Sequence, residues 1–329
     1  MEFLILAIET SCDDTSVAVI KNKKILSNVV SSQLDHSNLG GVVPELASRK
    51  HLVNIQMVMR EALNQSQIAL NDLDAIAFTQ GPGLLGSLLV GINYAKGLSL
   101  ALQKPLIAVN HMEAHILAHW IDNTPELPFL CLTVSGGHTS LTLIHENPLN
   151  HQLIGHTLDD AAGEAFDKIS KLLGLPYPGG PFIDRYAQKG QPIYRFPKPN
   201  VPKYHFSFSG FKTAVKNFLS DFPTPSFENE LPNICASVQH AIINILIEQF
   251  QKAILDFKPA SIGIAGGVSA NSLLRKQILE LGEQLHLPTY IPKLEYCTDN
   301  AAMIAITAHY KLEKQDFCDF SVVPFSKIF

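Results

Sequence analysis

The sequence is poor in cysteine, and its cysteines form no recognisable pattern. The 329 residues contain only Cys12, Cys131, Cys235, Cys297 and Cys318, which are scattered and include no Cys-x-x-Cys pair. An odd, dispersed set excludes a disulfide framework and indicates a reducing compartment.

The sequence also shows no recognisable targeting signal and no long apolar run. The apolar run at residues 3–8 is too short for a signal peptide and has no basic residues before it. No apolar span of about 18 residues is evident, so we expect no membrane helix. The expectation is a cytoplasmic protein without membrane association.

The chain has no excess of positive charge. Its 25 Lys and Arg against 30 Asp and Glu give a formal net charge of −5 and a pI of about 6.2. The overall charge therefore gives no case for nucleic acid, and any RNA must be held by a local patch or by another subunit.

The irregular residues 191–208 combine prolines, aromatics and cations. They are interpreted either as an RNA contact or, preferably, as a proline-rich surface loop.

What the sequence does contain is length and apolar content. With 46% hydrophobic and 17% charged residues, the chain has the composition of a compact globule. Its length is sufficient for two lobes with separate cores. A helix expected over residues 44–65 should bury Leu46, His51, Leu52 and Ile55 on one side.

Two histidines follow a short apolar strand expected at residues 105–109. His111 and His115 are four residues apart, so on a helix they project from one face and can clamp one metal ion. The zinc peptidase signature requires a glutamate directly after the first histidine. Here Glu113 is two residues after His111, which argues against a peptidase. Two ordinary helix histidines are the alternative, unless a third ligand exists elsewhere.

The sequence repeats a short pattern. Residues 8–20 read IETSCDDTSVAVI and residues 132–144 read LTVSGGHTSLTLI, each a strand, a turn of small or polar residues and a second strand. Two such hairpins predict two similar lobes, and their turns are suited to grip phosphate through amides and hydroxyls. Chance recurrence of a short pattern is the alternative.

Two strand–helix junctions later in the chain are also candidate binding elements. A strand expected at residues 260–265 runs into Gly266-Gly267, and a helix follows from residue 272, a layout that binds a nucleotide phosphate or sugar. Asp299 precedes a helix expected at residues 301–311. Either Thr298 or Asp299 is its N-cap, or Asp299 supplies the third metal ligand.

These motifs together resemble the universal TsaD family of tRNA threonylcarbamoyladenosine transferases, and the resemblance runs almost end to end. So many ordered blocks make an accidental similarity untenable. The matching blocks are IETSCDDT at 8–15, GVVPELASR at 41–49, GPGL at 81–84, HMEAH at 111–115, VSGGHT at 134–139, GEAFDK at 163–168, FSFSGFKT at 206–213, GGVSAN at 266–271 and CTDNAA at 297–302.

The resemblance implies an α/β fold of the actin-like ATPase (ASKHA) class, with two duplicated ribonuclease-H-like lobes and a central cleft. We expect an N-terminal lobe at residues 1–118, completed by a C-terminal helix at 299–329. The C-terminal lobe is expected at residues 119–298, with an irregular insertion around 190–208.

The resemblance also implies the site residues. His111, His115 and Asp299 are expected to hold one divalent metal per subunit, iron(II) with zinc as the alternative. Asp13 and Asp14 are the candidate catalytic carboxylates; many family members have Glu in place of Asp14, so the carboxylate here is one methylene shorter. The expected substrate-binding residues are Val134, Ser135, Gly136, Gly137, His138, Asp167, Gly180, Asp184 and Asn271.

The implied reaction transfers the threonylcarbamoyl group of threonylcarbamoyl-AMP to N6 of adenosine 37 in tRNAs reading ANN codons, and it releases AMP. An ATP- or ADP-type nucleotide is a further expected ligand of the cleft. Expected partners are tRNA, a TsaB-like paralogue in a heterodimer and a TsaE-like ATPase. The alternatives are an ATPase or kinase of the same fold, a metallopeptidase and a non-catalytic scaffold, which would lack the His-His-Asp set.

Overall fold

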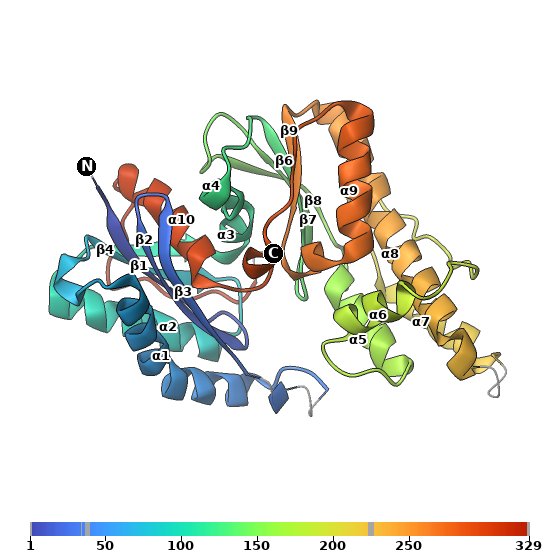
Figure 1. Ribbon diagram of the computed structural model, residues 1–329, viewed down its shortest axis with the longest axis horizontal. Coiled ribbons are helices and arrows are strands. Elements are labelled where there is room, and N and C mark those ends of the chain that lie inside the picture. Colours follow the sequence, from blue (N-terminus) through green and yellow to red (C-terminus); the bar gives the residue numbers. More distant parts are fainter. Residues whose placement is uncertain (1, 34, 37–39, 223–226, 328–329) are drawn as a thin grey trace. The chain divides into compact units, whose positions relative to one another are not determined.

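The structure is a computed structural model that describes residues 2–33, 35–36, 40–222 and 227–327. The chain forms two compact units, one made of Met1–Thr124 with Lys293–Phe329 and the other of Pro125–Pro292. Each unit is built on one five-stranded sheet (Figure 1). The lobe boundaries expected at residues 118 and 298 stay a prediction.

The first unit contains a mixed sheet with the strand order β3-β2-β1-β4-β5. Its first three strands form an antiparallel meander, and the last two are added parallel to β1. The strands are β1 (Leu4–Glu9), β2 (Asp14–Lys21), β3 (Lys24–Ser32), β4 (Ala75–Gly81) and β5 (Leu106–Asn110).

Helices cover both faces of this first sheet. The long helices α1 (Pro44–Ser66) and α2 (Leu85–Leu102) pack together on one face, where Leu6, Ile8 and Val17 belong to the same apolar core as α1. Helix α10 (Ala301–Glu313) contacts all five strands and lies on the other face (Figure 1). The short helices α3 (His111–Leu117) and α4 (His119–Asp122) follow β5, and single 3-10 turns lie at Leu70–Asp72 and Leu294–Tyr296.

The second unit repeats the plan of the first. Its sheet has the order β10-β9-β6-β7-β8, again an antiparallel meander with two parallel strands added beside its first strand. The strands are β6 (Phe129–Val134), β7 (Thr139–Ile144), β8 (His151–His156), β9 (Ser261–Ala265) and β10 (Thr289–Tyr290). The two repeated stretches of the sequence are the first hairpins of the two sheets, so the predicted duplication is confirmed.

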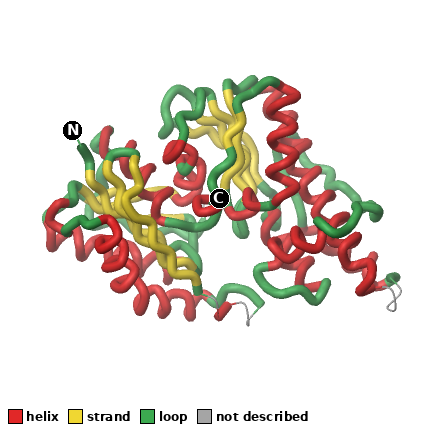
Figure 2. The backbone as a smooth tube through the Cα atoms, in the orientation of Figure 1, coloured by secondary structure: helices red, strands yellow, loops and turns green. Residues whose placement is uncertain are grey.

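In the second unit more of the chain is helical than is in strands (Figure 2). The largest core of this unit joins strand residues such as Leu130 and Leu132 to helix residues such as Phe166 and Phe250. The helices are α5 (Ala162–Leu172), α6 (Gly179–Ala187), α7 (Ser209–Ser220), α8 (Phe227–Phe257) and α9 (Ser272–Leu285), with a 3-10 turn at Gly267–Ala270.

Several local expectations differ from the structure. Leu52 is 66% exposed, and α1 buries the smaller Ala47 and Ala62 instead, because the helix lies close to the sheet and to α2. Strand β8 was not expected, since its half-exposed sequence HQLIGH has little apolar alternation. The C-terminal segment is helical only to Glu313.

Helix α2 corrects the expectation that no apolar span long enough for a membrane exists. It is the one helix of the described residues with that length and hydropathy. It contacts α1 and β4, and its small residues face the unit: a Cβ added at Gly91 would lie 2.3 Å from Oγ1 of Thr10. These contacts place α2 in the helical layer that covers one face of the first sheet.

Gly266 and Gly267 differ in how far they tolerate a side chain, which gives a matched test. Gly266 has a φ of +83°, and an added Cβ would lie 2.5 Å from the carbonyl oxygen of Val134, whereas Gly267 has open space. We expect Gly266→Ala to lower the free energy of unfolding by about 1–3 kcal/mol through backbone strain and the clash. Gly267→Ala should change it little. Equal losses in denaturant unfolding would contradict this account.

Candidate functional site

The two histidines are placed by the junction between β5 and α3. Asn110 ends the strand and caps the helix, because its side-chain oxygen accepts hydrogen bonds from the N–H groups of Met112 at 2.9 Å and Glu113 at 3.3 Å. His111 is therefore the first helical residue and His115 lies one turn later. The helix expected at the two histidines is therefore confirmed, and both side chains are buried.

Asp299 reaches the histidines from the segment before α10. The N-cap of α10 is Asn300, whose side-chain oxygen accepts the N–H of Met303 at 3.1 Å. The N–H of Ala301 donates to the Ser16 hydroxyl at 2.9 Å, which ties the start of α10 to β2. The alternative in which Thr298 or Asp299 caps the helix is thus wrong, and the Asp299 carboxylate is left to face the histidines.

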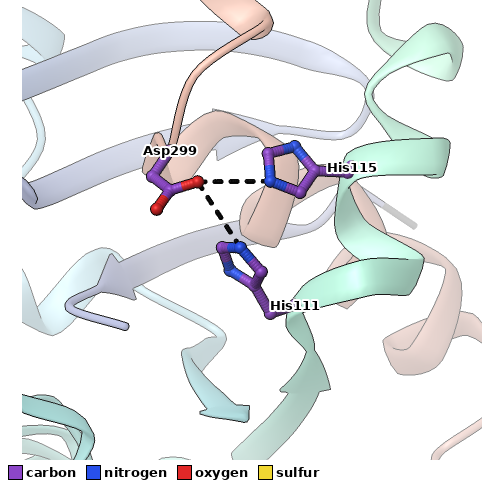
Figure 3. Close-up of side chains that lie close together, drawn as sticks. All are labelled: His111, His115 and Asp299. Carbon is purple, nitrogen blue, oxygen red and sulfur yellow. Dashed lines mark ion pairs between the residues drawn. The ribbon is translucent and has the colours of Figure 1, made fainter. Parts of the chain in front are cut away.

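Figure 3 shows the three side chains converging. Oδ1 of Asp299 lies 3.4 Å from Nε2 of His111 and 3.2 Å from Nε2 of His115. The imidazole rings are nearly perpendicular, with centroids 4.7 Å apart. One donor atom from each residue lies within 4.8 Å of the others, a spacing that one metal ion can bridge.

The chemistry of this set fits a metal ion. Nδ1 of His115 is buried without a hydrogen-bond partner among the described residues, and Nε2 faces the Asp299 carboxylate at 3.2 Å. A buried imidazole nitrogen beside a carboxylate fits a cation that would accept its lone pair. Two imidazole nitrogens and one carboxylate oxygen are ligands that suit zinc or iron.

A second carboxylate, Glu9, holds His111 from behind. It is fully buried, accepts a hydrogen bond from the Thr79 hydroxyl at 2.5 Å and lies 3.2 Å from Nδ1 of His111. Such a partner orients a ligating imidazole and leaves Nε2 for the metal. The sequence did not single out Glu9, because only the adjacency of β1, β4 and β5 brings it to His111.

The two histidines and Asp299 shift one another's pKa values. Burial opposes charge on His111, but the carboxylates of Asp299 and Glu9 outweigh it and raise the pKa of the imidazole to about 10. Burial instead keeps the pKa of His115 below its usual value. Burial alone would raise the pKa of Asp299, yet the neighbouring His111 holds it well below its usual range. A bound cation would take the place of the proton on His111.

Asp13 and Asp14 lie in the same unit, at the turn between β1 and β2. Burial raises the pKa of Asp14 to about 7, and the negative charges of Asp299, Asp13 and Glu9 add to this, against a hydrogen bond with Ser32. A carboxyl group with a pKa near neutrality is suited to accept a proton. The catalytic role of both residues stays a prediction.

The second unit holds the residues expected to bind substrate, and the first group is the β6–β7 turn. The N–H of Ser135 donates to the carbonyl of His138 at 2.8 Å, and the Ser135 hydroxyl accepts from the N–H of His138 at 3.1 Å. Gly136 and Gly137, between them, are exposed. The N–H of Gly163 donates to the Ser135 carbonyl, so the start of α5 supports the turn.

Asp167 has a structural partner in the following helix. Its carboxylate accepts the N–H of Gly179 at 2.6 Å, at the beginning of α6. Burial raises the pKa of Asp167, and these backbone N–H groups, including that of Gly180, oppose the rise. The structure thus supplies a local reason for an acidic residue in α5, and a contact with substrate stays a prediction.

Asp184 and Asn271 meet at the start of α9. Asp184 accepts hydrogen bonds from the N–H and hydroxyl of Ser272 at 3.1 and 2.5 Å. Asn271 caps α9 through Leu273 and Leu274 and donates to Gln239 at 2.9 Å. Gln239 and Ser272 line a cavity of about 420 Å³ within this unit, a volume in the range of ligand sites.

The metal assignment has a matched control on the next turn of the chain. His119 is as buried as His115, at 1% exposure, but is not one of the three converging residues. We expect His115→Ala and Asp299→Ala to reduce bound metal from about one per chain to a small fraction, while His119→Ala retains it. Metal content after reconstitution with iron(II) or zinc, with circular dichroism as the folding check, measures this. Metal retained by His115→Ala would refute the site.

Asp14 should reveal its environment in the pH dependence of stability. Its pKa in the folded protein, about 7, lies above the usual 3.8, so ionisation destabilises the fold increasingly from about pH 4 to pH 7 and fully above pH 7. In metal-free protein, Asp14→Asn should therefore raise the melting temperature at pH 8, by about 2–4 °C for each 1 kcal/mol relieved. The rise should be clearly smaller at pH 5 and should vanish below about pH 4. Identical shifts at both pH values would contradict this environment.

Comparison with known proteins agrees with this geometry. Residues 24–306 match the family model described as TsaD, tRNA N6-adenosine threonylcarbamoyltransferase. A protein of that name from Christiangramia forsetii is 53% identical over 98% of this chain and 97% of its own length. Another from Porphyromonas gingivalis is 48% identical over 99% of this chain and 98% of its own length.

Solved structures support the fold. HypF of T. kodakarensis matches with a TM-score of 0.64 and 15% identity, over 95% of this chain and 48% of its own. Component A of the (R)-2-hydroxyglutaryl-CoA dehydratase of Acidaminococcus fermentans matches with a TM-score of 0.56 and 15% identity, over 95% of this chain and 99% of its own. The actin-like fold is thus confirmed. By its family match and its full-length relatives, the chain belongs to the TsaD family of tRNA N6-adenosine threonylcarbamoyltransferases.

Proposed function

We propose that this protein transfers the threonylcarbamoyl group of threonylcarbamoyl-AMP to N6 of adenosine 37 in tRNAs that read ANN codons. The products are N6-threonylcarbamoyladenosine and AMP. The observation that carries the proposal is the convergence of His111, His115 and Asp299 in a chain of this family. An ATPase or kinase of the same fold is not favoured, and Met112 beside His111 argues against a metallopeptidase.

We infer that the metal is iron(II), with zinc as the alternative, held by His111, His115 and Asp299. When bound, it supplies a Lewis acid and a template for the oxygen atoms of the substrate. The protein's own contribution is to fix the ligands: Glu9 and Ser11 hold Nδ1 of His111, and Asn300 holds the backbone beside Asp299. Fixed ligands spare the site a reorganisation during the reaction.

The transfer requires a new C–N bond and the loss of one proton. The exocyclic amine of adenosine attacks the carbamoyl carbon, the C–O bond to the phosphate breaks, and AMP leaves with the bonding electrons. We assign the amine proton to Asp14, with Asp13 as the neighbouring carboxylate, because Asp14 has a pKa of about 7. An adenine amine is a poor nucleophile, so positioning contributes at least as much as proton removal.

The second unit is assigned the binding of the adenylate. The turn formed by Ser135, Gly136, Gly137 and His138 follows the buried Val134, and its two glycines are exposed. We assign the backbone amides of this segment and the His138 imidazole to the phosphate and carbamoyl groups. We assign ribose and adenine, or the same parts of an ATP- or ADP-type nucleotide, to Asp167, Gly180, Asp184 and Asn271.

The partners proposed are tRNA, a TsaB-like paralogue in a heterodimer and a TsaE-like ATPase, in the cytoplasm. The net charge of −5 gives the chain alone a weak overall attraction for tRNA. The first unit also exposes large apolar side chains on its packed helices α1 and α2, which supports a protein partner. They are Leu52, Val53 and Met57 of α1 and Leu85 and Leu89 of α2.

The direct test is transfer of labelled threonylcarbamoyl from its adenylate to tRNA, with TsaB- and TsaE-like subunits present. We expect His111→Ala to abolish transfer together with metal binding, and Asp14→Asn to lower the rate by about 10²-fold or more. His119→Ala serves as the matched buried histidine and should remain active. An inactive native chain with metal and partners bound would exclude the function, and an unaffected Asp14→Asn would remove the proton role.

A further inference from the structure

One stretch of the acidic chain is strongly basic. Residues 185–220 contain no Asp or Glu, although the whole chain carries a net charge of −5. The stretch includes the end of α6, the irregular segment that follows and all of α7 (Figure 2). Its cations are Arg185, Lys189, Arg195, Lys198, Lys203, Lys212 and Lys216.

The irregular segment is fixed against α7 by its aromatic residues. The Tyr194 ring lies 4.9 Å from that of Phe218, and the Phe196 ring lies 5.3 Å from that of Phe211. Because Tyr194 and Phe196 are held on α7, the residue between them, Arg195, is exposed on the other side of the chain. The same contacts occupy these rings, so they are not available to stack on nucleic-acid bases.

Two of the seven cations are already neutralised. Lys198 pairs with Glu248, and Lys203 pairs with Asp256, both on α8. The remaining five, Arg185, Lys189, Arg195, Lys212 and Lys216, form no ion pair with any residue in the described ranges. All of these are exposed except Lys212, which is half-buried. We call these five residues the basic surface.

The basic surface spans neighbouring elements of the second unit. Arg185 is in the last turn of α6, and Lys189 lies in the turn that follows this helix. Lys212 and Lys216 are four residues apart on α7, so they project in one direction. Helix α5 contacts both α6 and α7, so the two helices belong to one group in the second unit (Figure 1). Arg195 is attached to α7 through its aromatic neighbours.

We propose that the basic surface binds the phosphate backbone of the tRNA substrate, away from the nucleotide that is modified. This inference rests on the proposed function. Lys and Arg side chains that form no ion pair are the groups that contact phosphates, and such contacts position RNA without reading its sequence. Since the aromatic rings are packed on α7, charge and not base stacking provides the affinity, which makes binding strongly dependent on salt.

The test compares two double variants with the same change in charge, using the full chain with TsaB- and TsaE-like subunits. Lys212→Gln with Lys216→Gln removes two cations of the basic surface. Lys24→Gln with Lys314→Gln removes two exposed lysines of the first unit that form no ion pair with a described residue. Lys212→Arg with Lys216→Arg keeps the charge and controls for packing on α7.

The readout is tRNA affinity measured by fluorescence anisotropy over a range of NaCl concentrations. Losing two phosphate contacts should reduce the slope of log affinity against log salt by about 1.4–1.8, from about 0.7–0.9 per contact. The arginine pair and the first-unit pair should keep the native slope. If the variant Lys212→Gln with Lys216→Gln keeps the native salt slope, the inference is wrong. It is also wrong if this variant loses its partner subunits while its affinity for tRNA is unchanged.

Transfer kinetics separate this inference from the proposed function. For Lys212→Gln with Lys216→Gln we expect a KM for tRNA raised about tenfold or more and a kcat near the native value, because the surface positions RNA and does not contact the reacting atoms. If the native chain transfers no threonylcarbamoyl group, the proposed function fails. If it does, and the variant has the native KM, only the basic surface is wrong.

Discussion

The first unit depends on the burial of opposite charges at the edge where β1, β4 and β5 end. Glu9 is fully buried and lies against His111, which in turn faces Asp299. A buried carboxylate is tolerated only when it is paired and hydrogen-bonded, so Glu9, Thr79, Ser11 and His111 must keep their arrangement together. The pairing of Glu9 therefore brings three strand ends and the start of α10 together. It also fixes the orientation of the His111 imidazole.

Asparagine caps present the candidate residues at three strand–helix or loop–helix junctions. Asn110 caps α3, on which His111 and His115 share one face, Asn300 caps α10 beside Asp299, and Asn271 caps α9 beside Ser272. In each case the cap satisfies the first backbone N–H groups of the helix. The neighbouring side chains are therefore released from capping and are free for other contacts, which explains how a carboxylate before a helix can face histidines.

Two units with the same strand order differ in the residues of their first hairpins. The turn after β1 contains Asp13 and leads to Asp14, the first residue of β2, whereas its counterpart in the second unit contains the exposed Gly136 and Gly137. Carboxylates and imidazoles suit metal binding and proton transfer, and glycine amides suit phosphate. The long insertion between β8 and β9 then adds the helices that hold the basic surface, without changing the sheet.

The sequence by itself determined the duplicated fold, the histidine pair and the order of most strands and helices, because these depend on local periodicity and on repeated hairpins that need no distant partner. Only the tertiary structure excluded a capping role for Asp299, since that role depends on which residue bonds the first N–H groups of α10. It also showed that Glu9 lies against His111 and that Asp167 accepts the first N–H of α6. These contacts join residues through sheet pairing and helix packing, and spacing along the chain carries no signal of them. The helical periodicity also failed to predict that Leu52 is exposed, because the sheet and α2 determine which side of α1 is covered.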